Sequence, residues 1–85
     1  MSEVVIYSRP FCGYCELAKS LLEQKGVPYS EINVSEDRSR LSEMLDRSGG
    51  LMSIPQIFIR GRHVGGYTEL AERERHGQLD AMLAA

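Results

Sequence analysis

Short apolar runs alternate with amphipathic segments along this chain. Residues 3–8 are β-branched and aromatic at their centre and are followed closely by a proline, which predicts a buried strand. Residues 13–25 carry apolar side chains at helical spacing, and the glycine at position 26 and the proline at position 28 predict the end of that helix. Residues 29–34 alternate between polar and apolar positions, which is typical of a second strand.

The middle of the chain predicts a second helix and a third strand. Ser35 is placed to cap the helix, which is expected to end near the glycines at positions 49 and 50. Residues 54–59 are apolar apart from one glutamine and carry a proline near their start, which predicts a strand. The apolar stripe of the helix consists of Leu41, Met44 and Leu45.

The last third of the chain predicts a hairpin followed by a helix. The Arg60-Gly61 turn leads into a short strand through His63, which the Gly65-Gly66 pair ends. Thr68 is expected to cap a last helix, which continues after an interruption at Gly77. The apolar residues of this helix are Leu70, Leu79, Met82 and Leu83.

These elements follow the order β-α-β-α-β-β-α in a single expected domain, residues 1–85. The first strand, helix and second strand form a βαβ unit, so the two strands should be parallel with a right-handed crossover. The third and fourth strands are close enough in sequence to form a hairpin. The expected fold class is therefore α/β.

Composition narrows the function classes. The formal net charge is −2 and 26% of the residues are charged, so the chain shows no general attraction to nucleic acid or to an anionic membrane. No apolar run approaches the roughly 20 residues that cross a bilayer. Two cysteines are too few for the disulfide framework of a small secreted protein, and the N-terminus lacks a signal-peptide pattern. We therefore expect a cytoplasmic protein with neither nucleic acid nor membrane as a partner.

The two cysteines are the candidate chemistry. They stand three apart in Cys12-Gly13-Tyr14-Cys15, at the predicted start of the first helix. Unpaired N–H groups and the helix dipole stabilise negative charge there, so Cys12 is expected to react as a thiolate, helped by the nearby charge of Arg9. Cys15 lies one helical turn further on and is expected to be the less exposed partner. The spacing predicts a thiol pair that closes and reopens as a disulfide.

A structural zinc site is the alternative use of two such cysteines. Structural zinc normally takes four Cys or His ligands, and the remaining candidates, His63 and His76, are 13 residues apart, without the spacing of a ligand pair. We therefore predict no zinc site and assign neither histidine a function.

In this combination of motifs the sequence resembles the glutaredoxin family, and more closely its small dithiol bacterial members. The resemblance covers essentially the whole chain and rests on a cysteine pair after a strand, a short segment ending in proline before a strand, a glycine pair, and a hydroxylic or acidic start to the last helix. These are Cys12-Gly13-Tyr14-Cys15, Ser53-Ile54-Pro55, Gly65-Gly66 and Thr68-Glu69. The resemblance implies a thioredoxin-like fold, in which a central four-stranded mixed sheet is flanked by three helices.

The resemblance also implies a reaction. Such a protein is a glutathione-dependent thiol–disulfide oxidoreductase that reduces glutathione mixed disulfides and protein disulfides. Cys12 would attack the disulfide and hold glutathione, and a second glutathione would release it. Cys15 would be the resolving thiol that closes the Cys12–Cys15 bond. Glutathione is the expected co-substrate, and glutathionylated or disulfide-containing proteins are the expected partners.

The resemblance further implies a set of glutathione contacts. Arg9 matches the family's basic residue and would meet the glycyl carboxylate, with Gln56 as a weaker candidate. The backbone of Ile54, joined to the following proline by a cis peptide bond, would pair with the cysteinyl part. Thr68 and the start of the last helix would receive the γ-glutamyl carboxylate, while Tyr14 either lines the groove or only packs over the helix start. The remaining expected contacts are Ser53, Pro55, Gly66 and Glu69.

Three positions depart from the family pattern. Gly13 stands where dithiol members commonly have proline, which loosens the first helical turn. Ser53 replaces the usual threonine. Thr68-Glu69 stands where an Asp-Asp pair is common, which keeps a capping hydroxyl and removes one carboxylate.

Two other functions stay open at this point. The first is a homodimer that holds a [2Fe–2S] cluster between two Cys12 thiolates and two glutathiones, as related glutaredoxins with a small residue in place of the proline can do. Gly13 favours this function, whereas Cys15 argues against a dedicated carrier. The second is an electron donor reduced by a thioredoxin-type reductase. Arg9 and residues 65–68 favour reduction by glutathione over this alternative. Without a cluster the expected state is a monomer.

Overall fold

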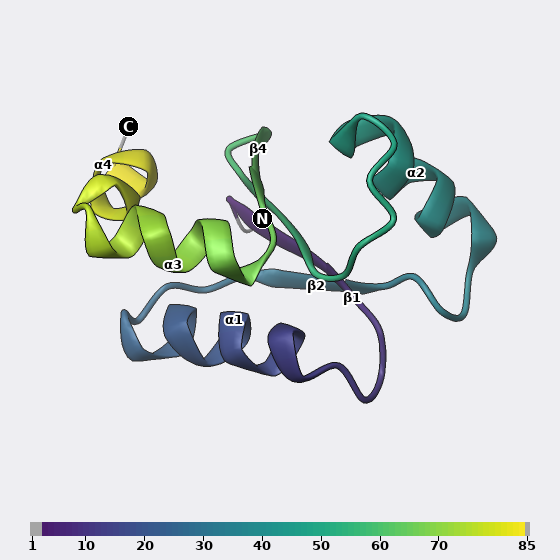
Figure 1. Ribbon diagram of the computed structural model, residues 1–85, viewed down its shortest axis with the longest axis horizontal. Helices are drawn as coiled ribbons and strands as arrows, with labels where there is room; N and C mark the ends of the chain where they lie inside the picture. Colours follow the sequence, from purple (N-terminus) through teal and green to yellow (C-terminus); the bar gives the residue numbers. More distant parts are fainter. Residues whose placement is uncertain (1–2, 85) are drawn as a thin grey trace.

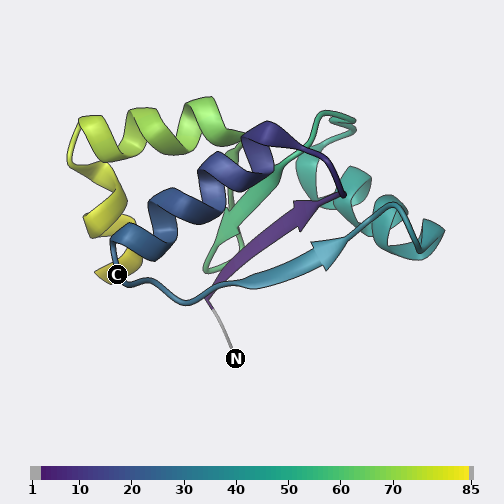
Figure 2. The ribbon, with the colours of Figure 1, turned by 90° about the horizontal axis from the view of Figure 1, so that it is seen from below.

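The computed structural model describes residues 3–84, which form a four-stranded sheet and four helices (Figures 1 and 2). The strands are β1 (Val4–Ser8), β2 (Ser30–Asn33), β3 (Gln56–Ile59) and β4 (Arg62–Gly65). The helices are α1 (Gly13–Gln24), α2 (Arg38–Ser48), α3 (Tyr67–Arg75) and α4 (Gln78–Ala84). None of the helices in this part of the chain has the length and apolar content needed to span a membrane.

The strand order in the sheet is β2-β1-β3-β4. β1 runs parallel to β2 and antiparallel to β3, and β4 runs antiparallel to β3, as the βαβ unit and the hairpin predict. Because of these directions, the end of β1, the start of β3 and the end of β4 meet at one edge of the sheet. The chain segments that leave or enter the strands at this edge therefore lie next to one another.

Side chains that alternate along β1 and β3 build an apolar core on each face of the sheet. α1, α3 and α4 cover one face and α2 covers the other, and Figures 1 and 2 show α2 set apart from the other three helices. The larger core consists of Val4, Ile6, Ala18, Leu22, Ile57, Ile59, Val64, Leu70 and Leu79. The smaller core consists of Tyr7, Val34, Met44 and Phe58.

The last helix predicted from the sequence is two helices in the structure. Gly77 adopts a left-handed conformation with φ +71°, which ends α3 and lets the chain turn into α4. The sheet is therefore flanked by four helices instead of the three expected. α3 also starts one residue before the predicted cap: its N-cap is Gly66, and Thr68 lies inside the first turn.

The starts of α2 and β3 also differ from the prediction. The N-cap of α2 is Asp37, whose carboxylate accepts from the Ser39 N–H at 2.9 Å, and Ser35 instead donates its N–H and hydroxyl to the Asn33 side chain at 2.8 and 2.7 Å. β3 begins at Gln56, two residues later than predicted, because Pro55 has no N–H to donate to a neighbouring strand.

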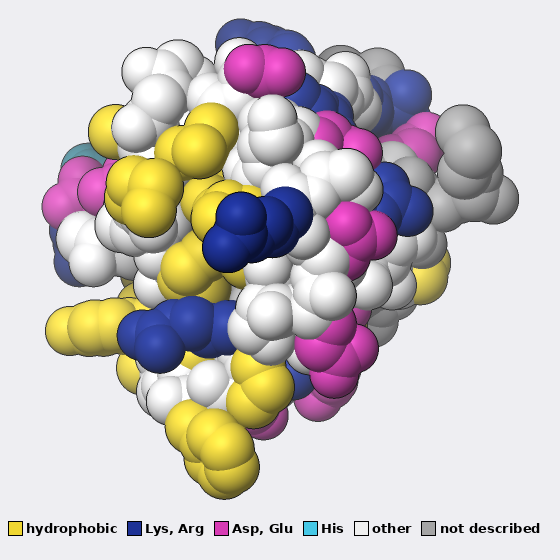
Figure 3. Space-filling model, turned by 90° about the vertical axis from the view of Figure 1, so that its right-hand side faces the viewer, with side chains coloured by type: hydrophobic (Ala, Val, Ile, Leu, Met, Phe, Trp, Pro, Cys, Tyr) yellow, Lys and Arg dark blue, Asp and Glu magenta, His cyan; other side chains and the backbone are white. Residues whose placement is uncertain are grey.

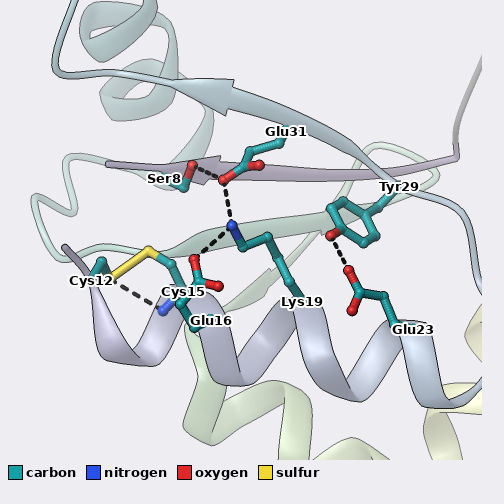
Figure 4. Close-up of polar contacts among 8 residues, drawn as sticks. All are labelled: Ser8, Cys12, Cys15, Glu16, Lys19, Glu23, Tyr29 and Glu31. Carbon is teal, nitrogen blue, oxygen red and sulfur yellow. Dashed lines mark hydrogen bonds and ion pairs between the residues drawn. A yellow bond between two sulfur atoms is a disulfide. The ribbon is translucent and has the colours of Figure 1, made fainter. Parts of the chain in front are cut away.

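A polar network joins the members of the βαβ unit (Figure 4). The Ser8 hydroxyl at the end of β1 donates to Glu31 of β2 at 2.6 Å. The Lys19 ammonium of α1 lies 3.1 Å from the same carboxylate and 2.7 Å from that of Glu16. Hydrogen bonds to these two carboxylates raise the pKa of Lys19. The network fixes α1 relative to the two strands on the side of the cysteine pair.

Replacing Leu70 with alanine should lower the free energy of unfolding by about 2–5 kcal/mol, because the side chain is fully buried between α3 and the sheet. Leu17→Ala is the matched control, since Leu17 also lies in a helix but is 48% exposed, and it should change the value by no more than about 0.5 kcal/mol. Urea denaturation measures both. Equal losses in the two variants would contradict the assignment of the core.

Replacing Glu31 with glutamine should reduce the loss of unfolding free energy that occurs as the pH falls. The hydrogen bond from Ser8, with help from Lys19 and against the effect of burial, lowers the pKa of Glu31 below its ordinary value of 4.5. A carboxylate with a lowered folded-state pKa stabilises the protein above its unfolded-state pKa, and this contribution is lost as the pH falls through the folded-state pKa. The wild type should therefore lose more free energy of unfolding below pH 4.5 than Glu31→Gln does.

Urea midpoints at neutral pH and at several values below 4.5 measure this difference. Glu36→Gln, which changes an exposed carboxylate in the loop before α2, is the control and should keep the acid slope of the wild type. If the free energy of unfolding falls with pH equally in Glu31→Gln and Glu36→Gln, the Ser8–Glu31 hydrogen bond does not contribute to stability.

Candidate active site

Cys12 and Cys15 form a disulfide at the N-terminus of α1 (Figure 4). Cys12 is the N-cap residue, and its sulfur accepts from the Cys15 N–H at 3.2 Å. Cys12 is 8% exposed and Cys15 is 1% exposed, so the outer and inner positions expected for the pair are confirmed. After reduction the same N–H and the helix dipole favour a thiolate on Cys12, which is the reactive form of the residue.

The segment before β3 lies against this sulfur. The Ile54 carbonyl oxygen is 3.9 Å from Cys12 Sγ, and the Ile54–Pro55 peptide bond is cis, as the family resemblance implies. The disulfide sulfur carries no hydrogen, so this is a contact and not a hydrogen bond. It leaves the backbone of Ile54 beside the reactive atom, where an extended peptide can pair with it.

A cavity of about 400 Å³ opens beside this segment. Its size lies within the range of ordinary small-molecule sites. The predicted glutathione contacts that line it are Tyr14, Ser53, Ile54, Pro55, Gln56, Gly66, Thr68 and Glu69. Other lining residues, which the sequence motifs did not single out as contacts, are Leu51, His63, Val64, Gly65 and Tyr67. Arg9 and the two cysteines are not among the described residues that line this cavity.

Two tyrosines form one wall of the cavity. Tyr14 of α1 and Tyr67 of α3 stack with their ring centroids 6.2 Å apart and their planes 26° apart. Tyr14 therefore both packs on a neighbouring helix and lines the cavity, which combines the two alternatives left open by the sequence. Tyr67 follows the glycine pair directly, and that position is the signal that could have identified it.

The glycine pair allows β4 to approach the proline segment closely. A Cβ on Gly66 would lie 3.3 Å from the Pro55 carbonyl oxygen. Gly65 has φ +122°, and a Cβ there would lie 2.8 Å from Glu69 Oε1. A side chain at Gly66 would therefore crowd Pro55, and one at Gly65 would displace the Glu69 side chain.

The start of α3 also borders the cavity. Glu69 Oε1 accepts from the Gly66 N–H at 2.7 Å, while the N–H groups of the first turn have no partner within the helix itself. Thr68 lies in this turn and is exposed. The site therefore offers N–H and hydroxyl donors, with one carboxylate next to them.

Gln56 is buried and does not present its amide to the cavity as a free donor. The side chain is 1% exposed, and its nitrogen donates to the Ser53 carbonyl oxygen at 2.9 Å and to Ser53 Oγ at 3.0 Å. Its oxygen lies 2.6 Å from His63 Nε2. In this structure the Gln56 amide is therefore engaged with Ser53 and His63, and its contact to a carboxylate of glutathione stays a prediction.

The surface around the cysteine pair is apolar with basic groups among the apolar ones. Figure 3 shows hydrophobic side chains gathered on the face that carries the loops at the right of Figure 1, with Lys or Arg side chains between them. Arg9 is exposed on the loop between β1 and α1. The large exposed hydrophobic residues, all near the start of α1 or before β3, are Phe11, Tyr14, Leu17, Leu51 and Met52.

The arrangement does not include a metal site. Among residues 3–84, no group of three or more His, Cys, Asp or Glu side chains is placed to hold a metal ion.

Comparisons with known proteins agree with this chemistry. The family model for glutaredoxin matches residues 4–64. A glutaredoxin of Pseudomonas aeruginosa is 45% identical over 85 residues, and the match covers 100% of both chains. Glutaredoxin 3 of Escherichia coli strain K12 is 40% identical over 83 residues, which covers 98% of this chain and 99% of that protein.

Solved structures give the same result. A crystal structure of a buckwheat glutaredoxin–glutathione complex matches with a TM-score of 0.88 at 31% identity, covering 98% of this chain and 77% of that one. The solution structure of glutaredoxin from Brucella melitensis matches with a TM-score of 0.82 at 46% identity, covering 98% of this chain and 89% of that one. Because these matches extend over the whole fold and the redox pair is in place, the protein belongs to the glutaredoxin family and is a thiol–disulfide oxidoreductase.

Proposed function

We propose that this oxidoreductase depends on glutathione and reduces glutathione mixed disulfides and protein disulfides. The observation that carries the proposal is the position of the Cys12 sulfur, 3.9 Å from the Ile54 carbonyl oxygen at the border of the cavity. A peptide that pairs with the Ile54 backbone would bring its own sulfur next to Cys12. Glutathione is a tripeptide with cysteine in the centre, so its chemistry suits this geometry.

The reaction is a pair of thiol–disulfide exchanges. The Cys12 thiolate attacks the glutathione sulfur of the mixed disulfide, and the substrate protein leaves as a thiolate that takes up a proton. A second glutathione thiolate then attacks the glutathione held on Cys12, which forms glutathione disulfide and restores the Cys12 thiolate. The helix N-terminus assists both steps, because it stabilises the thiolate when it attacks and when it leaves.

The protein has groups that are complementary to the charged ends of glutathione. The first-turn N–H groups of α3 and the Thr68 hydroxyl suit the γ-glutamyl carboxylate, and the Glu69 carboxylate suits the ammonium group next to it. Arg9 suits the glycyl carboxylate, although it lies on the loop outside the cavity lining. The two tyrosines would cover the bound peptide. A buckwheat relative is described as a glutathione complex, which supports the same ligand here.

Protein disulfides would follow a second route. Cys15 sits close enough to form the disulfide with Cys12, so it can attack a Cys12–protein mixed disulfide and release the protein. The exposed apolar side chains beside the pair would contact the polypeptide substrate. Either route needs only one copy of the chain, so we propose a monomer, acting in the cytoplasm where glutathione is kept reduced.

A [2Fe–2S] homodimer is the second candidate, because the Cβ position of Gly13 faces open space at the helix start. Each copy would supply Cys12 as a cluster ligand. When the pair is oxidised, Cys12 is bonded to Cys15 and is no longer a ligand. A wild type that stays colourless after anaerobic reconstitution with iron, sulfide and glutathione would rule out the cluster. A visible absorbance band that vanishes in Cys12→Ser, together with a dimer in size-exclusion chromatography, would support the cluster instead.

Cys12→Ser should abolish the glutathione-dependent reduction of a glutathionylated peptide, measured with glutathione reductase as the coupling enzyme. Cys15→Ser should retain most of this turnover, because glutathione itself resolves the Cys12 mixed disulfide. The same Cys15→Ser variant should lose activity on a protein disulfide, where the resolving thiol is needed. Turnover without Cys12 would refute the mechanism, and an inactive wild type would refute the dependence on glutathione.

A further inference from the structure

We infer that His63 is a positioning residue of the glutathione site: its Nε2–H holds the Gln56 amide, and that amide holds the segment 53–55 beside Cys12. The inference rests on the proposed function, because the position of this segment affects turnover only if glutathione binds beside it. His63 lies in no sequence motif of the site. The observation that points to it is a continuous chain of hydrogen bonds from β4 to the loop before β3.

The acceptor atoms determine which group donates in each of these hydrogen bonds. The Ser53 carbonyl oxygen can only accept, so the Gln56 atom 2.9 Å from it is the amide nitrogen. The Gln56 amide oxygen therefore points the other way, toward His63 Nε2 at 2.6 Å. Because an amide oxygen can only accept, His63 carries a hydrogen on Nε2.

One side of the exposed His63 imidazole packs against Phe58. His63 stands opposite Phe58 in the β3–β4 register, and the two ring centroids are 5.0 Å apart. Arg47 of α2 lies 4.3 Å from the centroid of the Phe58 ring and donates to the Tyr7 hydroxyl at 2.7 Å. Gln56 is two residues before Phe58 and so shares its face of the strand. The histidine therefore reaches Gln56 across the hairpin on the face that α2 covers.

The hydrogen-bond chain has two consequences for a ligand. Ser53 Oγ accepts from Gln56, so its own hydrogen is available to a carboxylate or carbonyl group in the cavity that Ser53 lines. The same amide holds the Ser53 carbonyl oxygen, which fixes the start of Ile54, the residue in contact with Cys12. Loss of the Nε2–H leaves a buried amide oxygen without its partner, and an amide that rotates to satisfy it abandons Ser53.

His63→Leu tests the inference, because it removes the donor and keeps an apolar side chain against Phe58. His63→Gln is the conservative variant, since its side-chain N–H has a similar reach. His63 is itself exposed, so His76→Leu, at another exposed histidine outside the site, is the matched control. The readouts are kcat and KM for a glutathionylated peptide in the coupled assay, with thermal unfolding as a check of folding.

His63→Leu should raise KM about tenfold, equivalent to about 1.4 kcal/mol, with kcat changed by less than about twofold. His63→Gln should restore most of the affinity, and His76→Leu should match the wild type. An unchanged KM in folded His63→Leu overturns the inference. A lower unfolding temperature with wild-type kinetics also overturns it, because that result describes a residue that acts only on stability.

Nuclear magnetic resonance gives a readout that does not depend on turnover. The wild type should show the His63 tautomer or imidazolium with Nε2 protonated, and His63→Leu should shift the amide signals of Ser53, Ile54 and the Gln56 side chain, whereas His63→Gln should largely preserve them. A neutral His63 protonated only on Nδ1, or unshifted signals, overturns the inference. If the wild type has no turnover but the signals shift as expected, the proposed function fails while His63 still holds the segment.

Discussion

The antiparallel pairing of β1 with β3 is the constraint on which the site depends. Tyr7 stands opposite Gln56, so the chain that leaves β1 and the chain that enters β3 meet at the same edge of the sheet. Cys12 and Ile54 are 42 residues apart in sequence and come into contact for this reason. The pairing is stabilised by apolar side chains that β1 and β3 bury on both faces of the sheet. The reactive cysteine and the backbone that would bind its substrate are therefore positioned by the core itself.

The β3–β4 hairpin brings the remaining parts of the site, the end of β4 and the start of α3, to the same edge of the sheet. β4 returns antiparallel to β3, so it ends beside the proline segment, where Gly66 permits a close approach to Pro55 and Gly65 a close approach to Glu69. α3 begins immediately afterwards and brings its free N–H groups to the cavity. The reactive cysteine and the N–H donors that border the cavity thus come from two helix N-termini at one end of the sheet. At both helices, the partial positive charge of the N-terminus stabilises negative charge.

Much of the fold follows from local patterns, and the differences have local causes. The four strands and the order of elements up to the last predicted helix match the prediction, since the apolar runs and turn residues are strong signals. The cap of α2 was predicted at Ser35 and is Asp37; both residue types are good caps, and the choice depends on Asn33, which engages Ser35. Gly77 was expected to interrupt one helix and separates two, because its left-handed conformation redirects the chain. Helical periodicity does not contain that information.

The sequence by itself determined the redox pair, its place at a helix start, and the motifs that border the cavity, because these features depend on residue type and short-range spacing. Only the tertiary structure decided what each side chain does there. Gln56, a weaker candidate for the glycyl carboxylate in the sequence, is buried, and His63, which belongs to no motif, holds it in place. The reason is that the partners of these side chains are set by the register between β3 and β4 and by packing against α2. Those contacts join residues from separate elements, and no single segment of the chain encodes them.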